Sequence, residues 1–566
     1  MSRRRIVLTA LWLLTLVGLA VRVWRASSIS GSYDEEIDSL VYLSQRWLQG
    51  GLLYQESYLR QWPIVQLLYA PAAWLGSIQA HRILILGLNL LGGVLLASAV
   101  RNFSRAGLIQ LEPNSLVPLA SGILLVILSQ KIPGGIAGSP HQFANTFLVL
   151  CVYTLARGLP AAGEPHGPRA WLVATGAMGL LAVACFFTLI YPLTLVSLLV
   201  LVHHRQPGRA AGALAGGAVL ATALMVLPYL FVANGLSHAW AGAVALPLEW
   251  ISQQIWREAD VGFLFGALIR TPIAGLPLWL LVLMPAAGVL LIARQTWKTS
   301  GRRRERLLLV PGLAVVFLLE LTWSFQRTDF NGHDGQLVVV PVVLFVASGM
   351  AALERSGRPA VRRAAFGGTL ILSLILFNNM FIAEVFGAPS RLSSRVIALE
   401  QDRTMLRTYL ASLPAESRGF TAPQDPALQW QLKVPSTTVG IGPDWSLNPQ
   451  GMKASWATSV IGLPVGVAQT CAQLLQPANA HLVWKRVDPE GPNTEAFMRQ
   501  CLSQEPGRWV ELTQDLGLRT GEFRLFSRQG DPISAAAPSD LTRSAGLSGE
   551  QDKLFEGQTS SAADTP

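Results

Sequence analysis

The chain has 566 residues, of which 51% are hydrophobic and 14% charged, and its mean hydropathy is +0.40. Soluble proteins carry roughly 25% charged residues and a single soluble core stops growing at about 250–300 residues, so these values, with many long apolar runs, exclude a soluble enzyme, a coiled coil and a disordered scaffold. The net charge of +10 does not indicate nucleic-acid binding, because basic residues of a polytopic membrane protein gather in its cytoplasmic loops.

The N-terminal segment begins with Met1-Ser2-Arg3-Arg4-Arg5 and continues with an apolar run, Ile6–Trp24. We expect an uncleaved first span with a cytoplasmic N-terminus, because the run is long and more spans follow. Further runs suit spans of about 17–25 residues or slightly shorter, packed ones: 83–100, 116–130, 142–156, 170–186, 189–202, 210–234, 276–293, 307–325, 336–352 and 364–386. The sequence therefore predicts an α-helical polytopic membrane protein with about 11 transmembrane helices.

The run Pro63–Ile78 is short and contains two prolines. If it spanned the membrane, every later loop would change sides and the basic cluster Arg302–Arg306 would face outward, against the positive-inside bias. If it lies on the outer surface, the cytoplasmic segments hold more than twice as many Lys and Arg residues as the outer loops. We therefore expect an interfacial helix, anchored by Trp62 and Trp74.

The first outer loop, 25–82, holds the densest acidic cluster of the chain, Tyr33-Asp34-Glu35-Glu36-Ile37-Asp38. The apolar spacing of Ile37–Leu48 predicts an interfacial amphipathic helix, whose N-terminus favours ionised Asp34 and Glu35. Asp34 is the candidate general base for an acceptor that arrives from outside. We interpret Glu36 and Asp38 as helix caps or solvated loop residues.

The same loop supplies the candidate ligands of a lipid-linked phosphate, Arg60 and Arg82, since an arginine offers a phosphate two donors at once. Ordinary phospholipid anchoring is the alternative for both. Other candidate residues are a lone His141, interpreted as a hydrogen-bonded loop residue, and His333, a donor at the entrance of a late span. Residues expected to line a cavity are Tyr33, Tyr54, Tyr58, Arg257, Arg270 and Glu320.

The residues after the last span predict an external α/β domain, 387–530, and a disordered tail, 531–566, behind a transmembrane domain, 1–386. The β-like runs are Thr437–Ile441, Ala480–Trp484, Trp509–Leu512 and Glu522–Phe526, and the helical runs are Ser393–Leu413, Val465–Gln476 and Thr494–Gln504. Cys471 and Cys501 either pair in an oxidising compartment or remain thiols. Cys151 and Cys185 lie within predicted spans, where we expect inert packing residues.

The order of motifs resembles the GT-C superfamily of membrane glycosyltransferases, in the branch of protein O-mannosyltransferases and lipid A aminoarabinose transferases. The motifs are Tyr33-Asp34-Glu35, Gly50-Gly51-Leu52-Leu53-Tyr54, Arg60-Gln61-Trp62-Pro63, Arg82, and His333-Asp334 followed by Leu337 to Pro341. The resemblance covers about residues 1–390. It departs from the family where Gln61-Trp62-Pro63 replaces a Lys-Pro-Pro-like stretch and where 131–145 has no acid.

The resemblance implies a glycosyltransferase in the plasma (inner) membrane, with an external C-terminal domain. The enzyme would move a sugar from a polyprenyl phosphate to a lipid, glycan or protein acceptor on the outer face and invert the anomeric centre. Asp34 would be the base or the residue that orients the acceptor, with Glu35 beside it, and Arg60, Arg82 and His333 would contact the donor phosphate. No cofactor is expected, and a divalent metal is retained only as an alternative because the second outer loop lacks an acid.

Three other classes remain open. A transporter or flippase would show broken spans and acids near the bilayer midplane. A polymerase or ligase with a lipid-diphosphate donor would shift the chemistry from Asp34 to Arg257, Arg270 and His333. A receptor-like or structural protein would use the external tail and leave the cluster in 33–82 unexplained.

Overall fold

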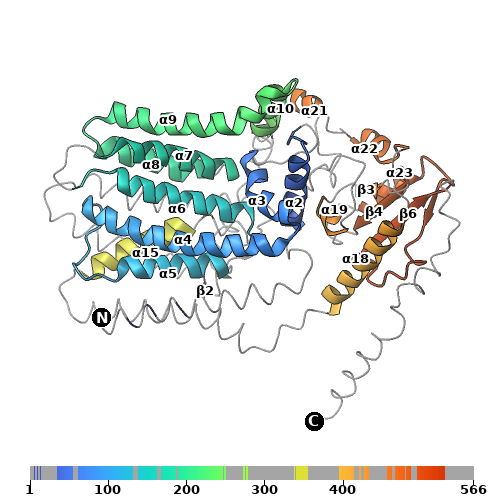
Figure 1. Cartoon of the computed structure of the whole chain (residues 1–566), viewed down its shortest axis with the longest axis horizontal. Helices are drawn as coiled ribbons and strands as arrows, with labels where there is room; N and C mark the ends of the chain where they lie inside the picture. The colour runs from blue at the N-terminus through green and yellow to red at the C-terminus, as the bar shows by residue number, and fades with distance from the viewer. Residues whose placement is uncertain are drawn as a thin grey trace, which may run out of the picture. The chain divides into compact units, whose positions relative to one another are not determined.

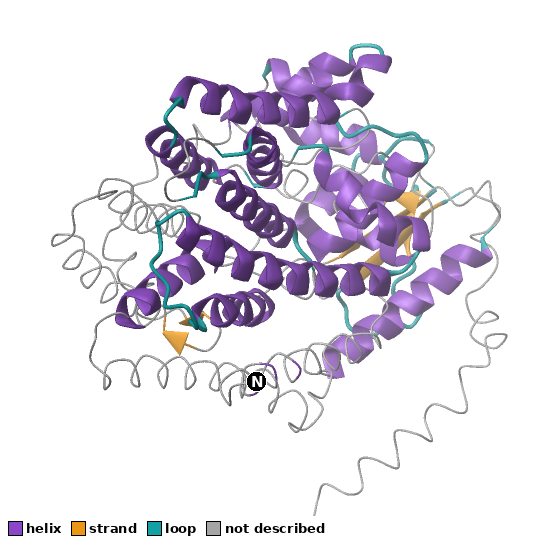
Figure 2. Cartoon of the chain, turned by 60° about the vertical axis from the view of Figure 1, so that its left-hand side comes forward, coloured by secondary structure: helices purple, strands orange, loops and turns teal. Residues whose placement is uncertain are grey.

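The computed structural model describes residues 35–54, 62–131, 138–161, 167–186, 189–246, 339–354, 394–413, 426–432, 455–461, 466–477, 480–485 and 494–529, with isolated positions between them. Helices form most of this described part, and strands are confined to one short pair and one small sheet (Figure 2). The chain separates into two compact units. Unit 1 is Met1–Ile37, Ser44–Leu53 and Leu59–Pro389, and unit 2 is Asp38–Leu43, Tyr54–Tyr58 and Ser390–Pro566.

Unit 1 is a helical bundle whose long helices lie side by side (Figure 1). The helices are α3 (Ile64–Leu75), α4 (Ile78–Arg105), α5 (Val117–Lys131), α6 (Pro140–Gly158), α7 (Arg169–Cys185), α8 (Ile190–His203), α9 (Pro207–Val226) and α15 (Val339–Glu354). Shorter elements are η2 (Leu227–Phe231), α10 (Gly235–Trp240), η3 (Ala241–Ala245) and the antiparallel pair β1 (Pro272–Ile273) and β2 (Leu276–Pro277).

The bundle helices coincide with the apolar runs predicted between 83 and 234 and at 336–352. The runs 6–24, 276–293, 307–325 and 364–386 lie outside the described residues, apart from a few positions. Two described segments, Ile78–Arg105 and Pro207–Phe231, are long and apolar enough to cross a membrane by themselves. Five other apolar helices are shorter. This composition fits a polytopic membrane protein.

The junction between α3 and α4 is a sharp turn. Helix α3 ends at Gly76, whose φ of 60° is left-handed, and Ser77 then caps α4 by accepting a hydrogen bond from the Gln79 N–H at 3.3 Å. The 12 residues of α3 extend about 18 Å, which is well short of a hydrocarbon core of about 30 Å. Trp74 remains 78% exposed near the end of α3.

Small residues let the helices of unit 1 approach closely. A Cβ on Gly176 of α7 would overlap the carbonyl oxygen of Leu214, and a Cβ on Gly217 of α9 would overlap that of Val173. The backbones of α7 and α9 are therefore in direct contact, as is common between membrane helices, where packing replaces the hydrophobic effect. Gly216, next to Gly217, has nothing within 4 Å of its Cβ position.

Unit 2 contains a four-stranded mixed sheet in the order β3-β4-β6-β5. The strands are β3 (Phe420–Thr421), β4 (His481–Lys485), β5 (Trp509–Glu511) and β6 (Phe523–Arg528), and only the β3–β4 pair is parallel. Its helices are α18 (Ser394–Ser412), α19 (Pro426–Leu432), α21 (Trp456–Ile461), α22 (Gly466–Leu474) and α23 (Thr494–Leu502).

Both faces of this sheet are covered, because alternate strand residues point to opposite sides. Val483 and Leu525 pack on one side, in a cluster that also takes side chains from α18 and α19. Leu482 and Phe526 pack on the other side, with side chains from α22 and α23. Unit 2 is thus a three-layer arrangement of helices, sheet and helices.

Several of these elements were not predicted from the sequence. The predicted helices near 393–413, 465–476 and 494–504 and the strands near 480–484, 509–512 and 522–526 have counterparts. The predicted strand Thr437–Ile441 lies outside the described residues. No pattern in the sequence predicts β3, α19 or α21, because these elements are only two to seven residues long and too short for a periodic pattern.

A disulfide joins Cys471 of α22 to Cys501 of α23. It settles the alternative that the sequence left open and ties together the two helices on one face of the sheet. Cys151 and Cys185 are buried free thiols in α6 and α7.

In unit 2, the Glu505 carboxylate accepts hydrogen bonds from Arg528 at 2.7 Å and Trp509 at 3.1 Å. Burial opposes ionisation of Glu505, but these bonds and the charges of Arg528 and Arg508 outweigh it and lower its pKa.

The close crossing of α7 and α9 predicts opposite effects for two neighbouring glycines. Gly217→Ala should destabilise the full-length protein in detergent by about 1–3 kcal/mol, because the new methyl group separates two backbones. Gly216→Ala is the matched control and should be neutral or slightly stabilising, since it adds a better helix former in open space. Thermal unfolding measures both, and equal midpoints for the two variants would contradict this packing.

The disulfide predicts that only Cys151 and Cys185 react with an alkylating agent in the denatured, unreduced protein. Cys471→Ser should lower the stability of unit 2 by about 3–4 kcal/mol, because the bridge closes a 30-residue separation. Peptide mass spectrometry checks the pairing and denaturant unfolding checks the energy. Alkylation of all four cysteines before reduction would show that the bridge is absent.

Candidate functional site

Few of the sequence-predicted site residues fall in the described part of the chain. Arg82 and Tyr54 are described with their side chains, and Glu35 is described only as the first residue of α2 (Glu35–Leu48). The positions outside the described residues are Tyr33, Asp34, Tyr58, Arg60, Arg257, Arg270, Glu320 and His333. The roles assigned to them remain predictions.

Helix α2 begins at Glu35, inside the acidic motif and two residues before the predicted start at Ile37, and it is more buried than an interfacial helix. Every residue from Ile37 to Ser44 is buried. Asp38 is fully buried and accepts a hydrogen bond at 2.6 Å from Nε2 of Gln431, a partner in unit 2. The interpretation of Asp38 as a cap or solvated residue is therefore wrong. The sequence could not reveal this, because the partner lies almost 400 positions away.

Two hydrogen bonds within unit 1 fix the surroundings of α3. The Ser44 hydroxyl at the middle of α2 donates to the Gln66 carbonyl at 2.6 Å, and the Trp62 N–H donates to the Ala184 carbonyl at 3.0 Å. The start of α3 is thus tied both to α2 and to the end of α7. These bonds hold the segment that leads to α4 and Arg82.

Arg82 lies in the second turn of α4 and is 1% exposed, which makes it the largest fully buried side chain of the described residues. A guanidinium is almost never fully buried unless it is paired, because leaving water is costly for a charge. Its rigid fork of donors matches a phosphate or carboxylate. Of the sequence-predicted cations, it is the one that the described structure places inside the bundle.

The start of α6 is fixed next to Arg82 by a pair of aromatic rings. The Tyr69 hydroxyl donates to the Gly138 carbonyl at 2.7 Å, and the same oxygen lies 3.1 Å from Nε2 of His81. The two rings are stacked with centroids 4.7 Å apart. Gly138 has a φ of 80°, and a Cβ there would overlap His81 and Ile85. Only glycine therefore fits this turn.

The turn after α2 is held from the far end of α9. The Tyr229 hydroxyl in η2 donates to the Leu53 carbonyl at 3.1 Å. Tyr54, the next residue, is fully buried with a φ of 69°. A non-glycine residue in the left-handed region is uncommon and persists only where the surroundings hold it. The Gly-Gly-Leu-Leu-Tyr segment is thus a fixed turn.

Four polar residues of unit 1 differ from the expectations drawn from the sequence: His141 was expected in a loop, and three buried amides were not expected as candidate site residues. His141 belongs to the first turn of α6 and lies 4.5 Å from the Phe186 ring, so its interpretation as a loop residue is wrong. Asn89, Gln142 and Asn145 are buried in the same bundle. The available signal was the presence of amides inside predicted apolar runs, where polar side chains are rare and functional by default.

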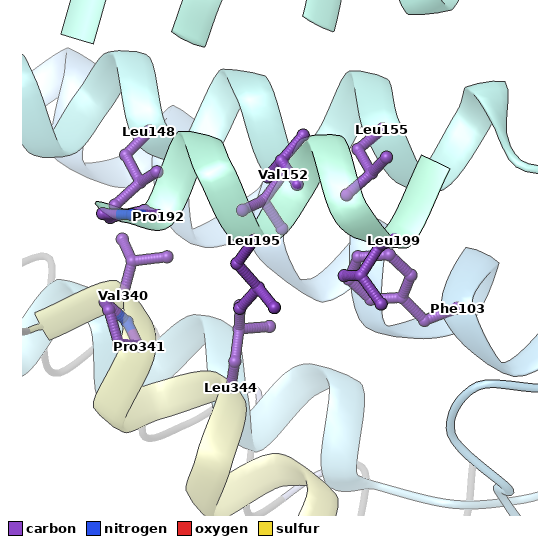
Figure 3. A pocket seen from close by; sticks show the side chains of 11 residues that line it. Phe103, Leu148, Val152, Leu155, Pro192, Leu195, Leu199, Val340, Pro341 and Leu344 are labelled. Carbon is purple, nitrogen blue, oxygen red and sulfur yellow. The ribbon is translucent and has the colours of Figure 1, made fainter. Parts of the chain in front are cut away.

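A second feature of unit 1 is a small, partly open apolar pocket, shown in Figure 3. It is bounded by α4, α6, α8 and α15 and lined by Phe103, Leu148, Val152, Leu155, Pro192, Leu195, Val196, Leu199, Val340, Pro341 and Leu344. Without polar groups it can hold a hydrocarbon but cannot carry out chemistry. Among the described residues, no three His, Cys, Asp or Glu side chains gather as a metal site.

No family model and no curated protein matches the chain. Among solved structures it is similar to ArnT from Cupriavidus metallidurans bound to undecaprenyl phosphate, with 13% identity and a TM-score of 0.55 over 92% of this chain and 98% of that chain. The apo form of ArnT gives 13% identity and a TM-score of 0.51 over 91% and 97%. At this identity the likeness concerns the fold alone. The resemblance stated from the sequence is confirmed at the level of the fold, which the chain shares with ArnT.

Proposed function

We propose that the chain is a multi-pass membrane glycosyltransferase that uses a sugar linked to a polyprenyl phosphate. The sugar passes to a lipid, glycan or protein acceptor on the outer face of the plasma (inner) membrane, with inversion. The GT-C fold supports this proposal, and so does the undecaprenyl phosphate in the ArnT structure with the same fold.

The observation that carries the proposal is the position of Arg82, buried in the second turn of α4, in the same outer loop of the sequence as the acidic motif. A guanidinium has five N–H donors, so it can bind a phosphate in addition to a partner within the protein. A phosphate on a lipid carrier has the charge, the geometry and the depth to meet it. Asp34 comes directly before Glu35, the first residue of α2, and Ser44 ties this helix to the same part of unit 1.

These groups suffice for an inverting transfer. Asp34 takes the proton from the acceptor nucleophile while the nucleophile attacks the anomeric carbon. The bond between that carbon and the phosphate oxygen breaks, and the polyprenyl phosphate leaves with the electron pair. Arg60, Arg82 and His333 offset the negative charge of the leaving group, and Glu35 orients the acceptor beside the base. No step requires a metal.

The proposal also includes the residues that line the reactant cavity and the side of the membrane on which each end of the chain lies. Tyr33, Tyr54, Tyr58, Arg257, Arg270 and Glu320 would line the cavity for the reactants. The disulfide between Cys471 and Cys501 supports an external position of unit 2, because disulfides persist in oxidising compartments. The N-terminus would then be cytoplasmic, in agreement with its three arginines.

Asp34→Asn should abolish transfer, because the amide cannot accept the proton. In membranes that lack the endogenous protein, we expect a loss of 100-fold or more (about 2.7 kcal/mol of barrier) in label transferred from a panel of polyprenyl-phosphate sugars. Glu36→Gln, expressed at the same level, removes a neighbouring carboxylate and should retain activity. Equal transfer by wild type and Asp34→Asn would remove Asp34 from the role of base.

Arg82→Gln should weaken binding of undecaprenyl phosphate at least tenfold, since a hydrogen bond to a charged group is lost. Arg82→Lys keeps the charge without the forked donors and should lie between this variant and wild type. Arg101→Gln is the control, because Arg101 is exposed near the other end of α4. Lipid titration of the purified protein measures the Kd, with thermal unfolding as the check on folding. An unchanged Kd in Arg82→Gln would show that Arg82 serves the bundle alone.

A further inference from the structure

A cluster of uncharged polar side chains is buried where α4, α5 and α6 meet. Asn89, Ser129, Gln142 and Asn145 are each at most 4% exposed. Nε2 of Gln142 donates to Oδ1 of Asn89, and Nδ2 of Asn145 donates to the Ser129 hydroxyl at 3.4 Å. We refer to Asn89, Gln142 and Asn145 as the amide cluster. Nothing in the steps assigned to Asp34 and Arg82 uses it.

The amide cluster keeps hydrogen-bonding capacity that the protein does not use. Nδ2 of Asn89, Oε1 of Gln142 and Oδ1 of Asn145 are buried and have no hydrogen-bond partner among the residues described. Exchanging the oxygen and nitrogen of Asn89 and Gln142 together leaves the same balance, with one amide N–H₂ group and one carbonyl oxygen free. Buried polar groups in native proteins are almost always satisfied, so the cluster requires a partner from outside the chain.

The position of the cluster suits the headgroup of a lipid carrier. Helix α6 has 19 residues and extends about 28 Å, close to the hydrocarbon thickness of about 30 Å. The sequence predicts a span at 142–156, and Gln142 at its start places the cluster near the expected membrane boundary. Asn89 is seven residues after Arg82, hence on the same face of α4 and about 10 Å farther along it. A group attached to a phosphate at Arg82 could reach this distance.

The chemistry of the cluster selects the ligand. A hydroxyl group donates one hydrogen bond and accepts others, so it matches amides that offer both a donor and an acceptor. Phosphates and carboxylates only accept and would leave the carbonyl oxygens unpaired, while an ammonium only donates and would leave the Asn89 amide unpaired. No charged side chain belongs to the cluster to offset either kind of ion.

We propose that Asn89, Gln142 and Asn145 bind hydroxyl groups of a neutral sugar carried by the polyprenyl phosphate. This inference rests on the proposed function and adds the class of sugar. The amides act as specificity-determining groups. A purely structural cluster would instead be expected to satisfy its own donors and acceptors.

The test uses the full-length protein in proteoliposomes with three undecaprenyl-phosphate donors: a neutral hexose, its deoxy analogues, and an amino sugar. Wild type should prefer the neutral hexose. Gln142→Met, nearly isosteric, should lower kcat/KM for that donor about tenfold, the value of one hydrogen bond. It should cause little further loss with the deoxy analogue that lacks the matching hydroxyl, since the variant and the analogue remove the same interaction.

The matched control is Thr146→Val, because the Thr146 hydroxyl already donates to the Gln142 carbonyl of its own helix. This variant should keep the sugar preference of wild type. The double variant Asn89→Leu with Gln142→Met should be at least as resistant to thermal unfolding as wild type, because it removes unsatisfied buried groups. A lower unfolding midpoint together with an unchanged sugar preference would assign the amides to structure and overturn the inference.

Binding of the carrier separates this inference from the function on which it rests. Gln142→Met should bind undecaprenyl phosphate without sugar as tightly as wild type does. If wild type transfers sugar and Gln142→Met discriminates between hexose and deoxyhexose equally well, the inference fails while the function stands. If wild type prefers the amino-sugar donor to the neutral hexose donor, the inference also fails while the function stands. If wild type neither binds the carrier nor transfers any sugar, both fail.

Discussion

The cost of placing a polar group inside an apolar helical bundle governs the arrangement of unit 1. Bulk water does not reach such a bundle, so each donor and acceptor must find its partner in the protein, a ligand or a buried water. Tyr69 and His81 meet this demand by sharing one carbonyl oxygen of Gly138. Arg82 and the amide cluster lie within two turns of the same region of α4. Arg82 and the amide cluster thus place polar side chains in the first turns of α4 and α6, while the pocket between α4, α6, α8 and α15 is apolar.

Close helix packing makes this concentration possible. Gly176 and Gly217 bring α7 against α9, and Gly122 of α5 approaches the Gly93 carbonyl of α4. Side chains on neighbouring helices then reach one another across short distances, as Asn89 and Gln142 do. The glycines also explain how a bundle with few charges keeps a defined geometry, because contact between backbones leaves little freedom for the helices to slide.

Unit 2 is stabilised differently. Its sheet has a core on both faces, and one of these cores contains the disulfide between α22 and α23. Residues of α2 belong to this unit as well, and Asp38 is held there by Gln431, whose carbonyl accepts two hydrogen bonds from Arg407.

The sequence by itself determined the helical class, the boundaries of most helices between 78 and 203, and the resemblance to the GT-C superfamily. These are local properties: an apolar run of suitable length forms a helix, and a motif in order along the chain can be read without its neighbours. It also pointed to Arg82, since charges are scarce in this chain. Only the tertiary structure decided that Asp38 is buried, that Cys471 pairs with Cys501, and that Asn89, Gln142 and Asn145 form one cluster. Those facts depend on which residues distant in sequence become neighbours, and side-chain periodicity carries no information about a partner on another helix.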